Sequence, residues 1–199
     1  MDHVIAAHGP VESTEVMGTV RGKVGMWLFL ASDAITFGAL LAAYGAMRIG
    51  SPDWPVPGQI LDIPLTAFNT FVLICSSLTM VKALSAIRRG DLKGLQKFLL
   101  LTALGGVMFL SIQAYEWTHL IGHDGLRLRN NLFCATFFSL TGFHGAHVFS
   151  GVVYLLVIYF RSRKGDFTAS NYTRVEVAGL YWHFVDLVWI LVFTFVYLI

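Results

Sequence analysis

Two acidic residues lie inside stretches of sequence that are otherwise almost wholly apolar. Asp33 belongs to the segment WLFLASDAITFG, and Asp186 belongs to the segment YWHFVDLVW. A carboxyl group surrounded by hydrocarbon is costly, so each acid needs a partner, a neutralising proton or a function. His183 lies within a helical turn of Asp186, whereas Asp33 has no ionisable residue within a turn. We therefore expect Asp33 to hold or share a proton, and Asp186 either to do the same or to join an interhelical hydrogen bond.

The spacing of some histidine and glutamate residues resembles that of metal ligands, but the sequence has too few of them for a di-iron site. His144 and His147 are three residues apart, and Glu116 and His119 form a Glu-x-x-His pair. A di-iron site in a helical bundle needs two such pairs and two further Glu residues. The sequence has one such pair. We therefore expect no di-iron centre.

Haem ligation is also disfavoured, because it needs axial histidines at matching depth on facing helices. At 1.5 Å per residue, His147 lies roughly 20 Å and His183 roughly 9 Å from the predicted cytoplasmic ends of their helices. We interpret His144, His147, His183 and Glu116 as interhelical polar contacts, and we predict that this chain binds no metal. Small residues beside the histidines permit close helix contact. They are Gly142, Gly145 and Gly151.

The elements that must position these side chains are membrane-spanning helices. Of the 199 residues, 56% are hydrophobic and 13% are charged, whereas a soluble domain carries about 25% charged residues. Five apolar stretches are long enough to cross a bilayer, for which about 20 residues suffice. We predict an all-α integral membrane protein in which a cytoplasmic tail, 1–23, precedes a five-helix membrane domain, 24–199. The predicted helices cover about 24–47, 65–87, 98–121, 132–160 and 177–198.

Charge and cysteine content exclude other classes of protein. A net charge of +2 is too small for a nucleic-acid-binding surface, so no nucleic-acid partner is expected. Cys75 and Cys134 lie in apolar runs and offer neither a disulfide framework nor a zinc site. Aromatic residues near the ends of the spans are interpreted as interfacial anchors. They are Trp27, Trp54, Trp117, Tyr181, Trp182 and Tyr197.

Lys and Arg residues are distributed unevenly between the two sides of the predicted bundle. The N-terminal flank, the second loop with its borders and the fourth loop together carry 11 of the 14 basic residues. The remaining three, on the other side, are Arg48, Arg127 and Arg129. Because basic flanks are retained in the cytoplasm, we predict an inside N-terminus and an outside C-terminus.

Four segments resemble subunit III of the haem–copper respiratory oxidases. GLYWHFVDLVWILVFTFVYL at 179–198 resembles the final helix of that family, and GFHGAHVFSG at 142–151 resembles its Gly-x-His-Gly-x-His-Val segment. NTFVLICSSLTM at 69–80 is similar to its Asn-Thr and Ser-Ser helix, and WLFLASDAITF at 27–37 to its Trp-to-Ser-Glu segment. The likeness covers about residues 20–199 in order. The five helices correspond to the shorter form of the family, without the first two of seven helices.

The resemblance implies a subunit of a proton-pumping cytochrome c oxidase that reduces oxygen to water. In that family, subunit III carries no haem or copper, supports catalytic subunit I, binds phospholipid and helps to sustain proton uptake. Haem and copper are then expected in partner subunits, which include subunits I and II, and the chain is expected in the prokaryotic inner (cell) membrane. Arg161 and Glu176 resemble the lipid-contact region of the family and are candidate headgroup ligands.

The electron donor stays open at this point. Asp33 stands where the family usually has a buried Glu, and an Asp there resembles the quinol-oxidising branch. The segment 181–186 resembles the cytochrome c branch. An alternative hypothesis is a small proton-coupled transporter that uses Asp33 and Asp186 as its proton relay. Such a transporter would need a continuous polar pathway through the bundle. The central runs FVLICSSLTM and WILVFTFVYL provide little of one.

Overall fold

A computed structural model describes the backbone of residues 10–122 and 131–199, and the side chains within those ranges from Val20 onward. In these ranges the secondary structure is entirely helical. The helices are α1 (Pro10–Ile49), α2 (Pro57–Ile60), α3 (Ile63–Arg88), α4 (Leu92–Gly122), α5 (Leu132–Arg163) and α6 (Thr173–Phe193), and the π-helical turn η1 (Thr194–Leu198) continues α6.

Five of these helices are long and apolar enough to cross a membrane. The prediction of an all-α membrane protein with five spanning helices is therefore confirmed. Each helix extends beyond its predicted span, and α1 begins at Pro10, so most of the expected N-terminal tail is helical. The proline-rich stretch after α1 is a connection that contains the short helix α2, for which Pro57 supplies the first residue.

The connection between α3 and α4 is shorter than the sequence predicts. Helix α4 begins at Leu92, directly after Arg89, Gly90 and Asp91. Gly90 has φ of +78°, a conformation that glycine adopts without the steric cost of a Cβ atom. The Asp91 carboxylate accepts a hydrogen bond of 2.8 Å from the Gly94 backbone N–H, as a helix N-cap does. Together they make a tight antiparallel hairpin.

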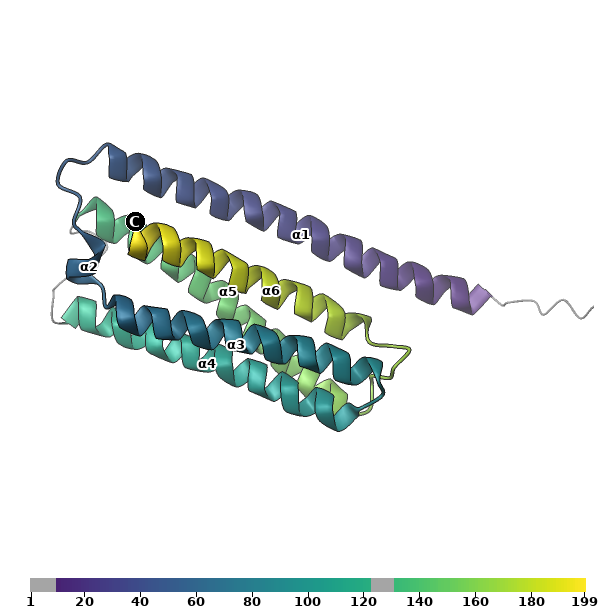
Figure 1. The fold of residues 1–199 in the computed structure, drawn as a ribbon. Coiled ribbons are helices and arrows are strands. Elements are labelled where there is room, and N and C mark those ends of the chain that lie inside the picture. Colours follow the sequence, from purple (N-terminus) through teal and green to yellow (C-terminus); the bar gives the residue numbers. More distant parts are fainter. Residues whose placement is uncertain (1–9, 123–130) are drawn as a thin grey trace, which may run out of the picture.

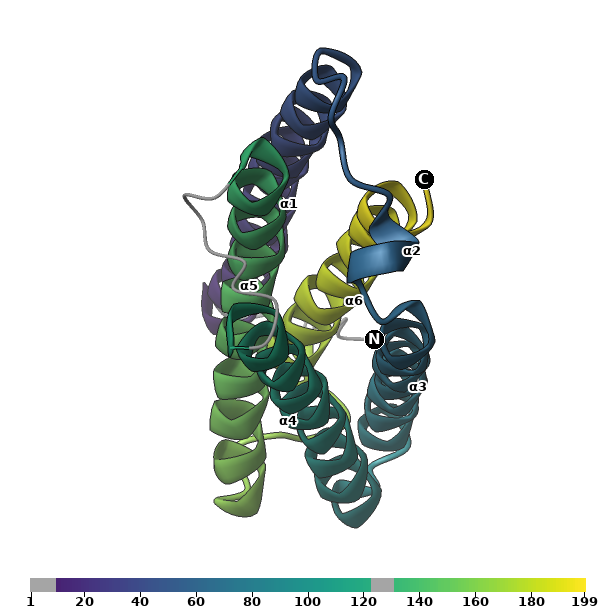
Figure 2. The ribbon, with the colours of Figure 1, turned by 90° about the vertical axis from the view of Figure 1, so that its left-hand side faces the viewer.

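The long helices run side by side, with α1 at one edge of the bundle (Figure 1). Helix α3 packs closely on α4, α4 packs on α5, and α6 contacts both α3 and α5. Helix α1 joins the bundle through α6 and α5, and the view in Figure 2 also shows it beside α5. Many of its apolar side chains are exposed, as a lipid- or protein-facing helix requires.

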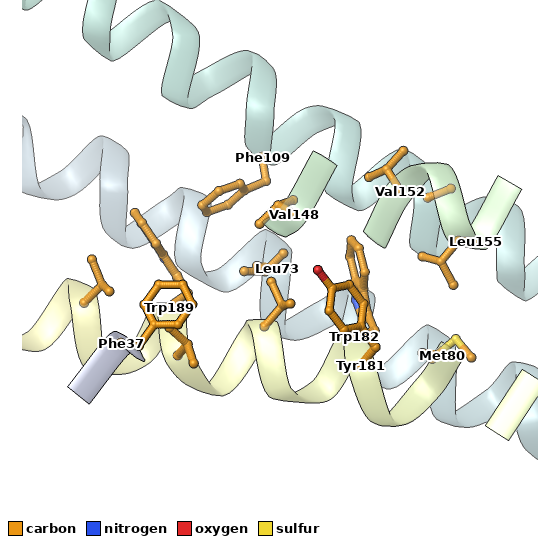
Figure 3. Close-up of a cluster of buried hydrophobic side chains, with 14 of the residues drawn as sticks. Phe37, Leu73, Met80, Phe109, Val148, Val152, Leu155, Tyr181, Trp182 and Trp189 are labelled. Carbon is orange, nitrogen blue, oxygen red and sulfur yellow. The ribbon is translucent and has the colours of Figure 1, made fainter. Parts of the chain in front are cut away.

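Tryptophan side chains fill the centre of the bundle. Trp182 and Trp189 are buried among side chains from several helices (Figure 3). A Cβ atom at Gly106 would lie 2.5 Å from Trp182 Cη2, and one at Gly151 would lie 2.9 Å from its Cζ3. The two glycines therefore make the space that the Trp182 indole occupies. Trp182 is 1% exposed, so its interpretation as an interfacial anchor was wrong.

The glycine prediction was right at two of its three positions. A Cβ atom at Gly142 would approach Trp117 at 3.0 Å, and Gly151 closely faces Trp182. Nothing lies within 4 Å of a Cβ atom at Gly145, so the prediction was wrong there. Tyr181 and Tyr197 are also buried rather than interfacial. Position near the end of a span does not reveal which helix face a ring occupies.

Candidate functional site

The Asp33 carboxyl group faces a histidine of another helix. His147 Nε2, on α5, lies 3.1 Å from Asp33 Oδ2, on α1, and the two side chains are 14% and 12% exposed. That oxygen makes no hydrogen bond of regular geometry with any described residue. The Phe37 ring packs edge-on to His147, with centroids 5.2 Å apart. The pair therefore lies between the edge helix and the bundle, screened on one side by an aromatic ring.

The hydrogen bond made by His147 Nδ1 determines whether Nε2 donates to Asp33 or accepts from it. His147 Nδ1 lies 2.8 Å from the Phe143 carbonyl oxygen, which can only accept, so Nδ1 carries a hydrogen. In the neutral ring Nε2 is then an acceptor. An unprotonated Nε2 facing a carboxylate would be repelled, so this contact requires a proton on Nε2 or on the Asp33 carboxyl. That Asp33 holds or shares this proton stays a prediction.

Glu116 occupies a completely different setting. Its Oε1 accepts a hydrogen bond from the Thr66 hydroxyl at 3.1 Å. Its Oε2 accepts from Gln113 Nε2 at 3.1 Å and from the Tyr197 hydroxyl at 3.0 Å. The donors come from α3, α4 and η1, and Glu116 is 6% exposed. This carboxyl group ties three elements together at the end of the bundle near α2.

Asp186 is buried as predicted, but its surroundings differ from the expectation. It is 8% exposed, and its Oδ1 has no hydrogen-bond partner among the described residues. His183 Nδ1 lies 2.5 Å from the Ser77 hydroxyl of α3, and the same hydroxyl lies beside the Asp186 carboxyl. No ion pair joins His183 to Asp186. The proposed His183 partner was wrong, because a serine from the facing helix serves both groups.

His144 contradicts its interpretation as a hydrogen-bonded contact. The side chain is fully buried, yet neither ring nitrogen has a hydrogen-bond partner in the described part of the chain. Its ring instead packs against Trp189, with centroids 4.9 Å apart, and against Phe109 at 5.7 Å. Because His144 and His147 are three residues apart, helix rotation turns one into the aromatic core and the other toward α1.

The residues expected at a lipid headgroup are both engaged in ion pairs within the chain. Arg161 Nε lies 2.8 Å from Asp166 Oδ2. Glu176 lies 2.8 Å from Lys23 Nζ and 3.6 Å from Arg88 NH2. These pairs join α1, α3 and α6 at the basic end of the bundle. Lipid binding by Arg161 and Glu176 stays a prediction.

Sequence reasoning missed the polar face of α3. Trp182 Nε1 donates to the Ser76 hydroxyl at 3.1 Å, and Trp189 Nε1 donates to the Thr70 hydroxyl at 2.9 Å. The Asn69 side-chain amide donates to the Phe109 carbonyl at 3.2 Å. The seven-residue spacing of the two tryptophans places both on one face of α6. This spacing was the feature of the sequence from which a shared polar partner helix could have been predicted. Among the described side chains, those of residues 20–122 and 131–199, no three His, Cys, Asp or Glu residues form a group that could hold a metal ion.

Comparison with known proteins gives one consistent family. The family model described as "Cytochrome c oxidase subunit III" matches residues 5–199. The chain is 39% identical over 177 residues to cytochrome c oxidase subunit 3 of Thermostichus vulcanus, covering 88% of this chain and 86% of that protein. It is 43% identical to the Synechocystis protein of the same name, covering 88% and 74%. It is 33% identical to quinol oxidase subunit 3 of Bacillus subtilis, covering 100% and 97%.

Proposed function

Because this chain belongs to the cytochrome c oxidase subunit III family, we propose that it is the non-redox subunit of a proton-pumping terminal oxidase that reduces oxygen to water. The chain is a multi-pass membrane protein and a subunit of an oxidase complex. In the proposal its direct partner is catalytic subunit I, with subunit II also in the complex. Haem and copper are bound by the partner subunits.

The observation that carries the proposed role is the Asp33–His147 pair. It joins the edge helix α1 to α5, and its two side chains are 12% and 14% exposed, so they are largely shielded from water. The Asp33 Oδ2 atom accepts no hydrogen bond from a described residue, whereas the two Glu116 oxygens accept hydrogen bonds from three donors. We infer that the pair helps to sustain proton uptake by the neighbouring subunit, rather than acting only as a link between helices.

Co-purification tests the assignment directly. An affinity tag on this chain should retain a haem-bearing subunit in stoichiometric amount, visible in the reduced-minus-oxidised spectrum of the purified complex. The same chain isolated from its partners should give no haem or copper signal. Recovery of the chain alone from gently solubilised membranes, with no haem-bearing partner, would contradict the proposal and would favour the transporter interpretation.

The electron donor has two candidates. Cytochrome c is favoured by the names of several relatives, and quinol by a relative that this chain matches along its full length. The purified complex should oxidise reduced cytochrome c and leave a reduced quinol unchanged. The opposite preference would keep the subunit III assignment and change only the donor.

Orientation in the membrane is also proposed. The ion-paired end of the bundle carries Lys23, Arg88 and Arg161, and Arg48 lies at the other end of α1. Arg127 and Arg129 lie outside the described residues. The excess of basic residues at the ion-paired end favours a cytoplasmic location for that end in a prokaryotic cell. A reporter active only in the periplasm should work when fused after Ile199 and fail when inserted between Arg88 and Lys93. The reverse pattern would invert the orientation.

A further inference from the structure

Helix α1 has less apolar packing against the bundle than the other spanning helices. In its apolar 18-residue window 17% is buried, against 33–50% in the other four. A Cβ atom added at Gly22, Gly25, Gly38 or Gly45 would meet no atom within 4 Å, so none of these glycines brings α1 close to a neighbour. Grooves of about 410 and 240 Å³ lie beside its C-terminal half. Helix α1 therefore has space in which to shift.

Polar contacts at three levels hold α1 in place in the described part of the chain. At one end Lys23 forms an ion pair with α6, and at the other Arg48 donates to the Ile199 carbonyl. The third contact, the Asp33–His147 pair, lies between them. It is ten residues after Lys23, or roughly 15 Å along the helix. This pair is therefore the contact that determines where the middle of α1 lies.

The His147 ring is fixed with its Nε2 atom toward Asp33. Its Nδ1 atom lies 2.8 Å from the Phe143 carbonyl oxygen. The Phe37 and Phe143 rings pack edge-on to it, with centroids 5.2 and 4.6 Å away. If the proton at the contact is lost, two acceptors face each other at 3.1 Å. Because the ring is held on two sides, their repulsion is relieved by movement of α1.

The other titratable groups near the pair supply no replacement donor. The Tyr181 hydroxyl, on α6, is near Asp33 but donates to the His147 carbonyl at 3.1 Å and lies 2.6 Å from Ser150 Oγ. His144, on α5, is near His147 but its ring packs against Trp189. Asp33 Oδ2 accepts no hydrogen bond of regular geometry from a described residue. The contact between α1 and α5 therefore depends on the one proton of the pair.

We propose that the position of α1 is controlled by the proton on the Asp33–His147 pair. With the proton present, the middle of α1 packs on α5; without it, the middle of α1 moves away while the two end contacts hold. The coupling is reciprocal, so an α1 helix held against α5 binds the proton more tightly. The inference deepens the proton role proposed for the pair and does not depend on which subunits surround the chain.

Distance measurements on the purified oxidase complex in lipid nanodiscs test the movement. Spin labels are attached to non-natural amino acids at Ile35 of α1 and Val153 of α5, both exposed. Pulsed electron paramagnetic resonance gives their separation at about pH 5 and about pH 9, either side of the usual histidine pKa. The separation should increase by about 1–2 Å at the higher pH, the usual size of helix shifts. Labels at Leu78 of α3 and Val153 should keep their separation.

Asp33→Asn separates the proposed cause from a general effect of pH. Its side-chain amide donates to Nε2 without an added proton, so the short separation should persist at both pH values. Asp166→Asn, which changes an exposed acid paired with Arg161, is the matched control and should retain the wild-type shift. Equal shifts in Asp33→Asn and wild type, or a shift of the α3–α5 labels as large as that of the α1–α5 labels, would overturn the proposal.

A second variant covers the case in which Asp33→Asn does not assemble. The amide of His147→Gln can donate to the Asp33 carboxylate, so it should also remove the pH dependence of the separation. The haem spectrum of each sample is read separately. A complex that retains haem but shows no pH-dependent separation in the wild type would overturn this inference and leave the oxidase assignment intact. A shift in a chain that retains no haem-bearing partner would contradict the assignment and support the inference.

Discussion

Glu116 and Asp33 are both enclosed by helices in a membrane domain, but they are held in different ways. Glu116 accepts hydrogen bonds from Thr66, Gln113 and Tyr197, so both oxygens are fully used. Asp33 Oδ2 lies 3.1 Å from His147 Nε2 and accepts no hydrogen bond of regular geometry from a described residue. A carboxylate surrounded by donors is a structural link, whereas an acid facing a single basic partner is free to exchange a proton.

The largest expected effect comes from removing the Glu116 carboxyl group. Glu116→Ala leaves the buried Gln113 amide and Tyr197 hydroxyl without their acceptor, whereas the Thr66 hydroxyl still donates to the Asp62 carbonyl. We expect the change to cost roughly 2–4 kcal/mol of stability. The chain should be lost from the purified oxidase or should dissociate at a much lower temperature, measured by subunit retention on native gels after heating. Asp33→Ala is the matched control. If both variants dissociate at the same temperature, Glu116 contributes no more to the stability of the complex than Asp33 does.

Removing one of the three donors should have a smaller effect. Tyr197→Phe keeps the ring, which packs near Phe137 and Trp189, and deletes only the hydroxyl that donates to Glu116. The loss should be about 1 kcal/mol, the usual contribution of one hydrogen bond. The same heating assay measures it, with the exposed Tyr115→Phe as control. An unchanged dissociation temperature would mean that the Glu116 network does not depend on η1.

Asp33→Asn should change stability by less than about 0.5 kcal/mol, because the amide keeps the shape and loses no satisfied hydrogen bond. The consequence should appear in function, as weaker lipid retention or as faster loss of oxidase activity during turnover. Repeated-turnover assays on the purified complex measure the second effect. Failure of Asp33→Asn to assemble would show instead that the carboxylate charge is structural.

A chemical probe should separate the two acids without changing the fold. A hydrophobic carbodiimide reacts with protonated carboxyl groups. Because we predict that Asp33 holds or shares a proton, the reagent should label Asp33 in preference to Glu116 and to exposed acids. Peptide mass spectrometry locates the label, and Asp33→Asn should abolish it. Preferential labelling of Glu116 would reverse the roles that the hydrogen bonds assign to the two residues.

The five helices could be predicted from the sequence, because a continuous apolar run of about 20 residues is what a membrane-spanning helix requires. It also identified Asp33, since a carboxyl group in such a run is conspicuous. It could not identify His147 as the residue beside Asp33, because His147 is on another helix. The nearby His144 was an equally good candidate from the sequence. Which of the two faces α1 depends on helix rotation, and His144 instead packs against Trp189. Local spacing carries no information on that choice.

For Glu116, the sequence pattern suggested the wrong kind of partner. The Glu-x-x-His spacing drew attention to it as half of a metal site, but its partners are hydroxyl and amide groups. Two of the three, Thr66 and Tyr197, come from distant parts of the sequence. Trp182 was misassigned for a related reason, because the space for it is made by Gly106 and Gly151 on two other helices.

The tight connection between α3 and α4 also bears on how the protein is made. Asn69 of α3 donates to the Phe109 carbonyl of α4, and the hydroxyls of Thr79 and Thr102 are 2.7 Å apart. The Asn69 amide would be costly to expose to hydrocarbon on a single helix, whereas the two threonine hydroxyls also donate to carbonyls of their own helices. We expect the two helices to leave the translocon together, so a chain truncated after Gly122 should integrate stably and one truncated after Arg88 should integrate poorly. On this expectation the polar face of α3 is covered first by α4 and later by the two tryptophans of α6.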